Sequence, residues 1–233
     1  MPYYAPSQNE LNPAPVIDKY IEYCEAAGVS AAGRNILEIG TGATNSTGYE
    51  ITARLRCSYW GYEPFEKFNE KLDCAMFNCV KTRYPDAEKG RVIRTTTLDT
   101  MPEKSIDVIF SNSVLEHVTD TNALIAGLKR VLKPGGRMLH AVDYRDHFFK
   151  YPFHFLQFSR RTWDRWLNPG DLPRHRISDH MELFRKNGFS VEVIQKKNDY
   201  PAFTAIKKKI HPEFAGYTDE DLASTIGVIF VKG

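Results

Sequence analysis

The chain has 233 residues, of which 42% are hydrophobic and 26% charged, and its formal net charge at pH 7 is +2. This length is enough for one substantial core, and so small a net charge excludes the strongly basic surface that captures nucleic acid non-specifically. No segment approaches the roughly 20 apolar residues needed to span a bilayer, and the first residues lack the basic start and apolar run of a signal peptide. We therefore expect a cytoplasmic protein with a single domain over residues 1–233 and no membrane partner.

The cysteines carry no metal-binding or redox pattern. They contain no CxxC pair, and no histidine follows them at zinc-finger spacing. We expect reduced, partly buried thiols and no metal. The four are Cys24, Cys57, Cys74 and Cys79.

The first half of the chain alternates between helix and strand patterns. Apolar residues at helical spacing from Val16 to Cys24, ended by Gly28, predict a helix in an amino-terminal segment, residues 1–33. The short apolar run at residues 35–40 is typical of a buried parallel strand, and residues 57–62 predict a second. An apolar helix face then follows, made of Phe65, Phe68, Leu72, Met76 and Cys79.

The same alternation continues along the chain. Residues 91–95 form a weak third strand pattern, and residues 106–111 form a strong fourth. A helix capped by Asp120 runs to Leu132, where the sequence KPGGR breaks it before a fifth strand at residues 138–142. The alternation predicts an α/β fold, a doubly wound, Rossmann-like, mostly parallel seven-stranded sheet with helices on both faces. Its cofactor-binding core covers residues 34–143.

The remainder divides into an insertion and the end of the sheet. Residues 144–178 are aromatic and rich in arginine, with Ser159 able to cap a short helix, and they predict an insertion after strand 5. Residues 179–233 complete the sheet with one helix and two strands. That helix is capped by Ser178 and ended by Gly188, and the strands cover residues 190–196 and 225–232.

The segment ILEIGTGATNSTG, which contains the first strand, favours a ligand site. Glu38 is followed by Gly40 and Gly42, so the backbone can turn tightly and approach a ligand without intervening side chains. Glu63 ends the second strand, where a carboxylate can accept hydrogen bonds from both hydroxyls of a ribose. A structural interpretation stays open, in which the glycines serve a strand-to-helix turn and Glu63 caps a helix starting near Pro64.

Four segments in order resemble the class I methyltransferases that depend on S-adenosylmethionine, from about Gly33 to the end of the chain. They are ILEIGTG, GYEP, IDVIFSNSVLEHV and LKRVLKPGGRMLHA. The resemblance implies S-adenosylmethionine as cofactor and S-adenosylhomocysteine as product. It places the ribose at Glu63 and the methionine end of the cofactor near Ser111 and Asn112. It also implies that the amino-acid part of the cofactor is wrapped by Glu38, Gly40, Thr41 and Gly42.

Two positions depart from the family pattern. A third glycine often extends the motif, and Thr44 stands there in this chain. Many relatives carry an acid where this chain has Thr97. We still expect adenine contacts at Thr97 and Leu98.

Methyl transfer needs alignment of three atoms more than it needs a covalent catalyst. For a hydroxyl on a small-molecule acceptor a general base helps, and we predict His147 in this role, oriented by Asp143 or Asp146. These residues could instead form only a polar loop. A variant places magnesium on Asp143, Asp146 and Asn112, although no spacing in the sequence demands a metal. Glu116 and His117 have two possible roles, which the sequence leaves open: they pack behind the fourth strand, or they take part in catalysis.

The insertion is predicted to cover the acceptor pocket. Its aromatic residues either line that pocket or form a small core of their own, and arginines such as Arg174 could meet an acidic group. The amino-terminal helix, preceded by Tyr3 and Tyr4, could close the other side. The aromatic residues concerned are Phe148, Phe149, Tyr151, Phe153, Phe155, Phe158, Trp163 and Trp166.

The sequence also bears on rival functions. A nicotinamide oxidoreductase requires a third glycine where this chain has Asn45. An enzyme that methylates an amino group on a base usually carries a proline-aromatic motif after the fourth strand, which SNSV lacks, so a nucleic-acid partner is disfavoured. A protein or RNA acceptor, or a module that binds the cofactor without turnover, stays open. The oligomeric state is expected to be a monomer or a homodimer.

Overall fold

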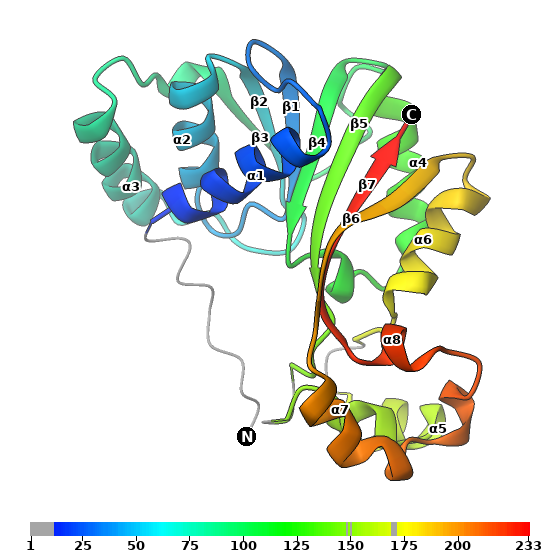
Figure 1. Cartoon of the computed structure of the whole chain (residues 1–233). Helices are drawn as coiled ribbons and strands as arrows, with labels where there is room; N and C mark the ends of the chain where they lie inside the picture. The colour runs from blue at the N-terminus through cyan, green and yellow to red at the C-terminus, as the bar shows by residue number, and fades with distance from the viewer. Residues whose placement is uncertain (1–11, 148, 150, 169–171) are drawn as a thin grey trace.

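The computed structural model describes residues 12–147, 149, 151–168 and 172–233 (Figure 1). These residues form one seven-stranded sheet in the order β3-β2-β1-β4-β5-β7-β6, in which only β7 runs antiparallel to its neighbours. The predicted fold class is confirmed. The strands are β1 (Asn35–Ile39), β2 (Ser58–Tyr62), β3 (Val92–Thr95), β4 (Ile106–Asn112), β5 (Leu132–Asp143), β6 (Ser190–Asn198) and β7 (Ser224–Lys232).

Helices cover both faces of this sheet because alternate side chains of the central strands point to opposite sides. On β1, Ile36 packs in a core with α1 (Ala14–Ala26) and α2 (Ser46–Leu55). Its neighbour Leu37 packs in a second core with α4 (Thr121–Val131) and α6 (Ile177–Lys186). Both faces are therefore buried, which is why the central strands read as short apolar runs.

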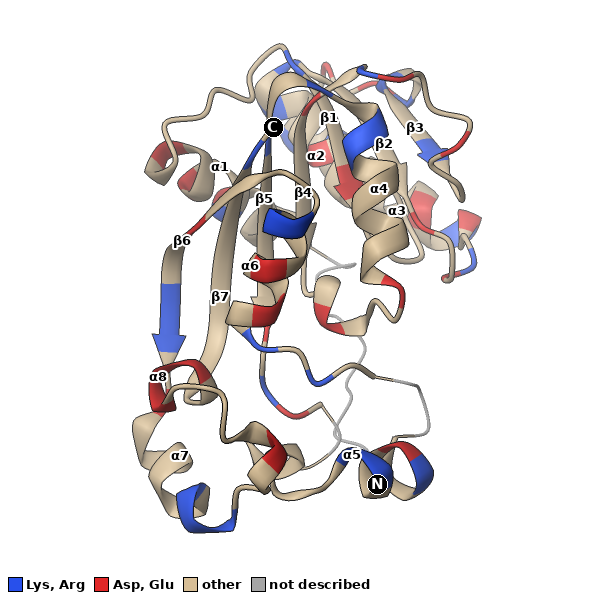
Figure 2. Cartoon of the chain, turned by 90° about the vertical axis from the view of Figure 1, so that its right-hand side faces the viewer, with Lys and Arg blue, Asp and Glu red and all other residues tan. Residues whose placement is uncertain are grey.

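Basic and acidic side chains are present in nearly equal numbers, 31 and 29, and both occur on the face seen in Figure 2. In the view of Figure 2, α6 carries acidic residues toward its start and basic residues at its end. Asp179 lies in the first turn, and Arg185 and Lys186 lie in the last turn, an order that suits the helix dipole. No helix within the described ranges is both long and apolar enough to cross a membrane.

Two predicted helix starts are wrong. α3 (Glu70–Arg83) begins after Asn69, whose side chain accepts a hydrogen bond from the Leu72 amide at 3.0 Å, so Phe65 and Phe68 precede the helix and are exposed. α6 begins at Ile177 instead of after Ser178. The hydroxyl of Ser178 donates to the Asp221 carboxylate at 2.5 Å and is not free to cap the helix.

Other local predictions are confirmed. Asp120 caps α4 by accepting from the Ala123 amide at 2.9 Å, and Ser159 caps the short α5 (Arg160–Thr162) through the Thr162 amide at 3.1 Å. The sequence KPGG is a bulge in the structure, because β5 already pairs with β4 at Leu132 and then again from Arg137. None of the four cysteines, all within the described residues, forms a disulfide.

The insertion after β5 packs together with a second segment, between β6 and β7, which was not predicted from the sequence. Residues 199–223, between β6 and β7, hold α7 (Tyr200–Ile206), α8 (Asp219–Leu222) and short 3₁₀ turns. They pack against the insertion and not against the sheet (Figure 1). We call this unit, formed by the described residues of 149–176 together with 199–223, the cap. Its core consists of Phe153, Phe155, Leu156, Trp163, Phe203, Phe214, Leu222 and Ala223.

The fully buried Arg176 joins the cap to the sheet. Its guanidinium donates to the carbonyls of Tyr144 at 2.8 Å and Ser224 at 2.5 Å, the residues at the ends of β5 and β7. It also donates to Leu222 in α8 at 3.2 Å. A buried guanidinium needs such hydrogen bonds, and these carbonyls belong both to the cap and to the sheet. Arg176 therefore fixes the cap at the end of the sheet where β5 finishes and β7 begins.

His140 makes the fold sensitive to acid. It is fully buried on β5, shares a hydrogen bond with Ser111 at 2.8 Å, and has a pKa that burial lowers from 6.5 to about 3. Between these two values the unfolded chain binds a proton that the folded chain excludes, so stability falls as pH falls. The slope of the unfolding free energy against pH is proportional to the number of protons taken up on unfolding. We expect His140→Gln to reduce that number by about one in this pH window, and the slope with it.

Urea unfolding at several pH values between 7 and 4 measures that slope. The half-buried His211, on the cap, supplies the control His211→Gln, which removes an imidazole from outside the sheet's core. An unchanged slope for His140→Gln would show that His140 is protonated in the folded state.

Candidate active site

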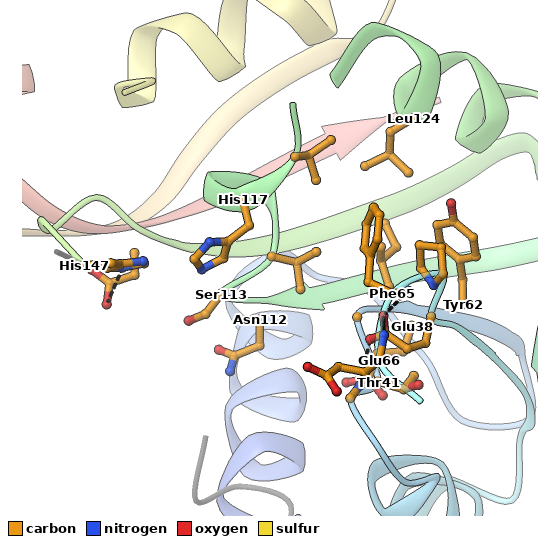
Figure 3. Close-up of a pocket in the computed structure, with 18 of the residues that line it drawn as sticks. Glu38, Thr41, Tyr62, Phe65, Glu66, Asn112, Ser113, His117, Leu124 and His147 are labelled. Carbon is orange, nitrogen blue, oxygen red and sulfur yellow. Dashed lines mark hydrogen bonds and ion pairs between the residues drawn. The ribbon is translucent and has the colours of Figure 1, made fainter. Parts of the chain in front are cut away.

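A cleft of about 1510 Å³ opens at the carboxyl ends of the central strands (Figure 3). Its walls come from the loops after β1, β2, β4 and β5, with further residues from the start of α4 and from the cap. The strand order reverses between β1 and β4, which is where ligands bind in doubly wound sheets.

The loop after β1 exposes its backbone to this cleft. Gly40 and Gly42 have φ angles of +76° and +67°, a region that residues with a Cβ rarely adopt. The Gly40 amide donates to the Tyr62 carbonyl at 2.8 Å. Arg94 of β3 holds the loop from the other side, donating to Thr41 Oγ1 at 2.9 Å and to the Gly42 carbonyl at 2.6 Å. Sequence analysis missed Arg94, because a single arginine on an edge strand carries no motif.

Glu38 lines the cleft, but its carboxylate serves the structure. It is 3% exposed and accepts hydrogen bonds from the hydroxyls of Tyr20 at 2.7 Å, Thr47 at 2.5 Å and Tyr59. Burial raises the pKa of Glu38, while these three hydroxyl donors act to lower it. Through these hydrogen bonds Glu38 positions α1, α2 and β2 around the loop, and its predicted contact with the cofactor stays a prediction.

Glu63, directly after β2, contacts the glycine loop, and its hydrogen bonds to a ribose stay a prediction. One carboxylate oxygen accepts from the Gly42 amide at 3.0 Å, and the other accepts from the amides of Phe65 at 3.0 Å and Glu66 at 3.1 Å. Three of about four acceptor positions are thereby used, so capacity for a ligand hydroxyl is left. The turn at residues 64–66 is held by Glu63, but no helix starts near Pro64.

The next wall of the cleft contains Thr97 and Leu98, where adenine contacts are predicted. Leu98 is 7% exposed and packs so tightly on α4 that a Cβ at Gly127 would lie 2.8 Å from it. Asp99 and the exposed Phe65 line the same region and were not predicted.

Of the two residues expected at the end of β4, only Asn112 lines the cleft. Ser111 is fully buried, and its hydroxyl is paired with His140 in the core beneath α6. Because neighbouring residues of a strand face opposite sides, the two could not both point toward one ligand. The predicted contact of the Ser111 side chain is therefore not supported by its placement.

Beyond Asn112, the cleft is bounded by polar residues that follow β4 and β5. His147 Nε2 lies 3.7 Å from Asp143 Oδ2, and Arg145 donates to the same carboxylate through Nε at 2.9 Å. Burial acts to raise the pKa of Asp143, but hydrogen bonds from His147 and Arg145 lower it well below its usual range. Asp143 therefore lies beside His147 as an ionised carboxylate, and its role in orienting His147 stays a prediction.

His117 lies beside this pair, and the two labelled histidines occupy the same end of the cleft in Figure 3. The ring centroids of His117 and His147 are 4.9 Å apart, and burial lowers the pKa of His117 to about 4. Glu116, its neighbour in chain, is 9% exposed, and burial raises its pKa to about 8. Sequence analysis left this pair open, and the geometry brings it to His147.

Asp146 is tied to the cap. Its carboxylate accepts from the amides of Phe149 at 2.9 Å and Phe155 at 2.7 Å, two residues of the cap. Asp146 thereby anchors the first turn of the cap. The magnesium variant on Asp143, Asp146 and Asn112 stays a prediction.

Most of the cap's aromatic residues are not in the cleft. Phe149 lines it, whereas Phe153, Phe155 and Trp163 are buried in the cap's own core, and Phe158 packs against that core. Arg174 is paired with Glu213 at 2.6 Å. Tyr151 and Trp166 are exposed, and the predictions for Phe148, Tyr3 and Tyr4 lie outside the described residues. From α1, Val16 reaches the cleft wall.

A family model described as a methyltransferase domain matches residues 14–194. The chain belongs to this family. Its fold and motifs place it among the class I methyltransferases, and S-adenosylmethionine is the cofactor of the site.

Individual relatives of this methyltransferase are distant. The ubiquinone biosynthesis O-methyltransferase of Rhodopseudomonas palustris (strain BisA53) is 25% identical over 202 residues, which cover 80% of this chain and 74% of that protein. The Haemonchus contortus phosphoethanolamine N-methyltransferase 2, solved with phosphomonomethylethanolamine and S-adenosylhomocysteine, superposes with a TM-score of 0.57 at 16% identity. That match covers 92% of this chain and 52% of the solved chain, so this chain spans about half its length.

A second solved structure has nearly the same extent as this chain. The S-adenosylmethionine-dependent methyltransferase of Mesorhizobium loti superposes with a TM-score of 0.53 at 18% identity, covering 93% of this chain and all of that one. At such identities the solved structures establish the fold of this methyltransferase and leave its acceptor to be inferred from the site.

Gly40 is the position where a side chain would do most harm to this methyltransferase. A Cβ there would lie 2.3 Å from Val114 Cγ2, whereas Gly135, with a similar φ of +75°, has open space around it. The left-handed backbone alone costs a substituted residue about 1–2 kcal/mol. We expect Gly135→Ala to lose about this much unfolding free energy and Gly40→Ala to lose clearly more.

Urea unfolding tests the difference, with Val114→Ala as background. Combining Gly40→Ala with Val114→Ala should recover the excess loss, because the clashing methyl group is then gone. Equal losses for the two glycine variants would refute the close approach of Val114 to Gly40.

Proposed function

We propose that this methyltransferase transfers the methyl group of S-adenosylmethionine to a hydroxyl group of a small molecule. The observation that carries the proposal is the pair of His147 and Asp143, 3.7 Å apart, at one end of the cofactor cleft. A histidine beside an ionised carboxylate suits removal of a hydroxyl proton near neutral pH. The O-methyltransferase name of the Rhodopseudomonas relative describes that protein and supports the same acceptor atom here.

The cofactor is assigned to the rigid side of the cleft. Its amino-acid part would lie against the backbone from Gly40 to Gly42, and a ribose hydroxyl would donate to the remaining acceptor position of Glu63. The adenine would lie along Thr97 and Leu98. The sulfonium and its methyl group would then face Asn112, which lies between the cofactor and His147.

The reaction is an in-line displacement. The acceptor oxygen forms a bond to the methyl carbon as the carbon–sulfur bond breaks, and the bonding electron pair neutralises the sulfonium. The hydroxyl proton passes to the lone pair of His147, and ionised Asp143 stabilises the imidazolium that forms. Because the leaving group is already activated, holding oxygen, carbon and sulfur in line is the largest contribution of the protein.

The size of the cleft and its walls support a small acceptor. Single-ligand pockets commonly measure about 300–1,000 Å³, so a cleft of about 1510 Å³ has room for the cofactor and a second molecule. The acceptor side is bounded by Phe149 and Pro152 from the cap and by Ile226 from β7. These apolar walls favour an aromatic or aliphatic body that carries the hydroxyl.

Turnover with methyl-labelled cofactor on a panel of phenols, alcohols, amines and carboxylic acids tests the acceptor class by mass spectrometry. We expect methyl ethers as products. His147→Ala and Asp143→Ala should lower turnover by about a hundredfold or more at unchanged cofactor affinity, since general-base catalysis contributes about 10²–10⁴. His211→Ala, a histidine that does not line the cleft, is the control.

Three results would contradict the proposal. Methylation of amines with no reaction of hydroxyl compounds would reassign the acceptor atom. Full turnover in both His147→Ala and Asp143→Ala would remove the pair from the mechanism. Cofactor binding with no product across the panel would favour a module that binds without turnover.

A further inference from the structure

Three potential metal ligands converge at the acceptor end of the cleft. Glu116 and His117 belong to a 3₁₀ turn, Leu115–His117, directly after β4, and His147 follows β5. One nitrogen or oxygen atom of each lies within 4.8 Å of the corresponding atoms of the other two. Two separate strand ends therefore bring two imidazoles and one carboxylate to a single point.

The Glu116 carboxylate contains an acceptor that the protein leaves unused. Oε1 accepts from the Asp143 amide at 3.2 Å, whereas buried Oε2 has no hydrogen-bond partner among the described residues. The side chain is only 9% exposed. A buried polar atom without a partner costs about 1–3 kcal/mol, so a group that fills this position stabilises the protein. The two histidines beside it point to a cation as that group.

The donor set and its support fit a transition metal. Two imidazoles with one carboxylate bind catalytic zinc and other divalent ions and leave positions open for a ligand. Ligand atoms held at about 2.0–2.2 Å from one ion lie closer together than 4.8 Å, so small side-chain rotations must close the site. Asp143 stands next to His147 at 3.7 Å, where a second carboxylate commonly orients a ligating histidine.

We propose that Glu116, His117 and His147 bind one divalent transition metal ion, which holds the acceptor hydroxyl at an open coordination position. The metal-binding part stands on this geometry alone, and the catalytic part rests on the proposed function. With the ion bound, the lone pair of His147 is a ligand and no longer takes the hydroxyl proton. This inference therefore keeps the proposed transfer to a hydroxyl group and replaces the general-base step by activation on the metal.

The chemical step stays balanced in this form. The metal-bound hydroxyl releases its proton to solvent water and becomes an alkoxide or phenoxide. Its oxygen then bonds to the methyl carbon while the carbon–sulfur bond breaks and the sulfur becomes neutral. The ether product has lost its negative charge and leaves the metal more readily than the alkoxide.

Titration of the chelator-treated full chain with Zn²⁺ and Co²⁺, without cofactor, tests the site by calorimetry and by the visible absorption of bound Co²⁺. We expect one equivalent per chain, and affinity at least tenfold weaker in His117→Ala and in Glu116→Gln. The matched controls His211→Ala and Glu192→Gln, at residues outside the cleft, should bind like the parent protein. Circular dichroism and cofactor affinity show whether each variant is folded.

The same proteins separate this inference from the proposed function. Absence of stoichiometric binding, or binding unchanged in both His117→Ala and Glu116→Gln, would overturn the metal site and would show that Glu116 is simply protonated. Chelation should lower turnover at least tenfold and Zn²⁺ or Mn²⁺ should restore it; full turnover without metal would overturn the catalytic part. Metal binding with no methylation of any hydroxyl compound would instead count against the proposed function.

Discussion

The binding end of this methyltransferase depends on a buried carboxylate in its first strand. Glu38 accepts the hydroxyls of Tyr20 from α1, Thr47 from α2 and Tyr59 from β2, so one side chain joins three elements around the loop that follows β1. Hydrogen bonds to a charged group contribute about 1.5–3 kcal/mol each, while a buried charge without donors is strongly unfavourable. The buried carboxylate is therefore stable only with its three hydroxyl donors in place. Together these four side chains hold the loop after β1 in the conformation that lines the cleft.

The two ends of the cleft are built differently. Where the cofactor is assigned, backbone dominates: Gly40 and Gly42 in left-handed conformations, a carbonyl held by Arg94, and an amide held by Glu63. At the acceptor end, side chains dominate, and they come from the turn after β4 and the loop after β5. The cap is tied to that second loop through Asp146. Variation of the cap and of these side chains can change the acceptor while the cofactor end keeps its geometry.

The features that could be predicted from the sequence are those that depend on residues adjacent in the chain. Buried parallel strands are apolar runs between glycines, so the strand at residues 35–40 and the turn at Gly40 and Gly42 were accessible, as was Glu63 at its expected spacing. Tertiary pairing was not accessible: nothing local shows that Ser111 turns to His140 or that Arg94 reaches the glycine loop. The cap's second half was missed because its helices are short and its apolar residues acquire meaning only against Phe153 and Trp163.

The central claim is that the loop after β1 and the carboxylate of Glu63 together receive the cofactor, the loop its amino-acid part and Glu63 its ribose. Calorimetric titration with S-adenosylhomocysteine tests it most directly, on the parent protein, on Glu63→Gln and on Glu103→Gln, which removes the same charge from a residue outside the cleft. The account predicts binding to the parent and to Glu103→Gln alike, and about 10- to 100-fold weaker binding to Glu63→Gln, as expected for lost hydrogen bonds to a charged acceptor. No binding to the parent, or equal affinity in all three proteins, would contradict it.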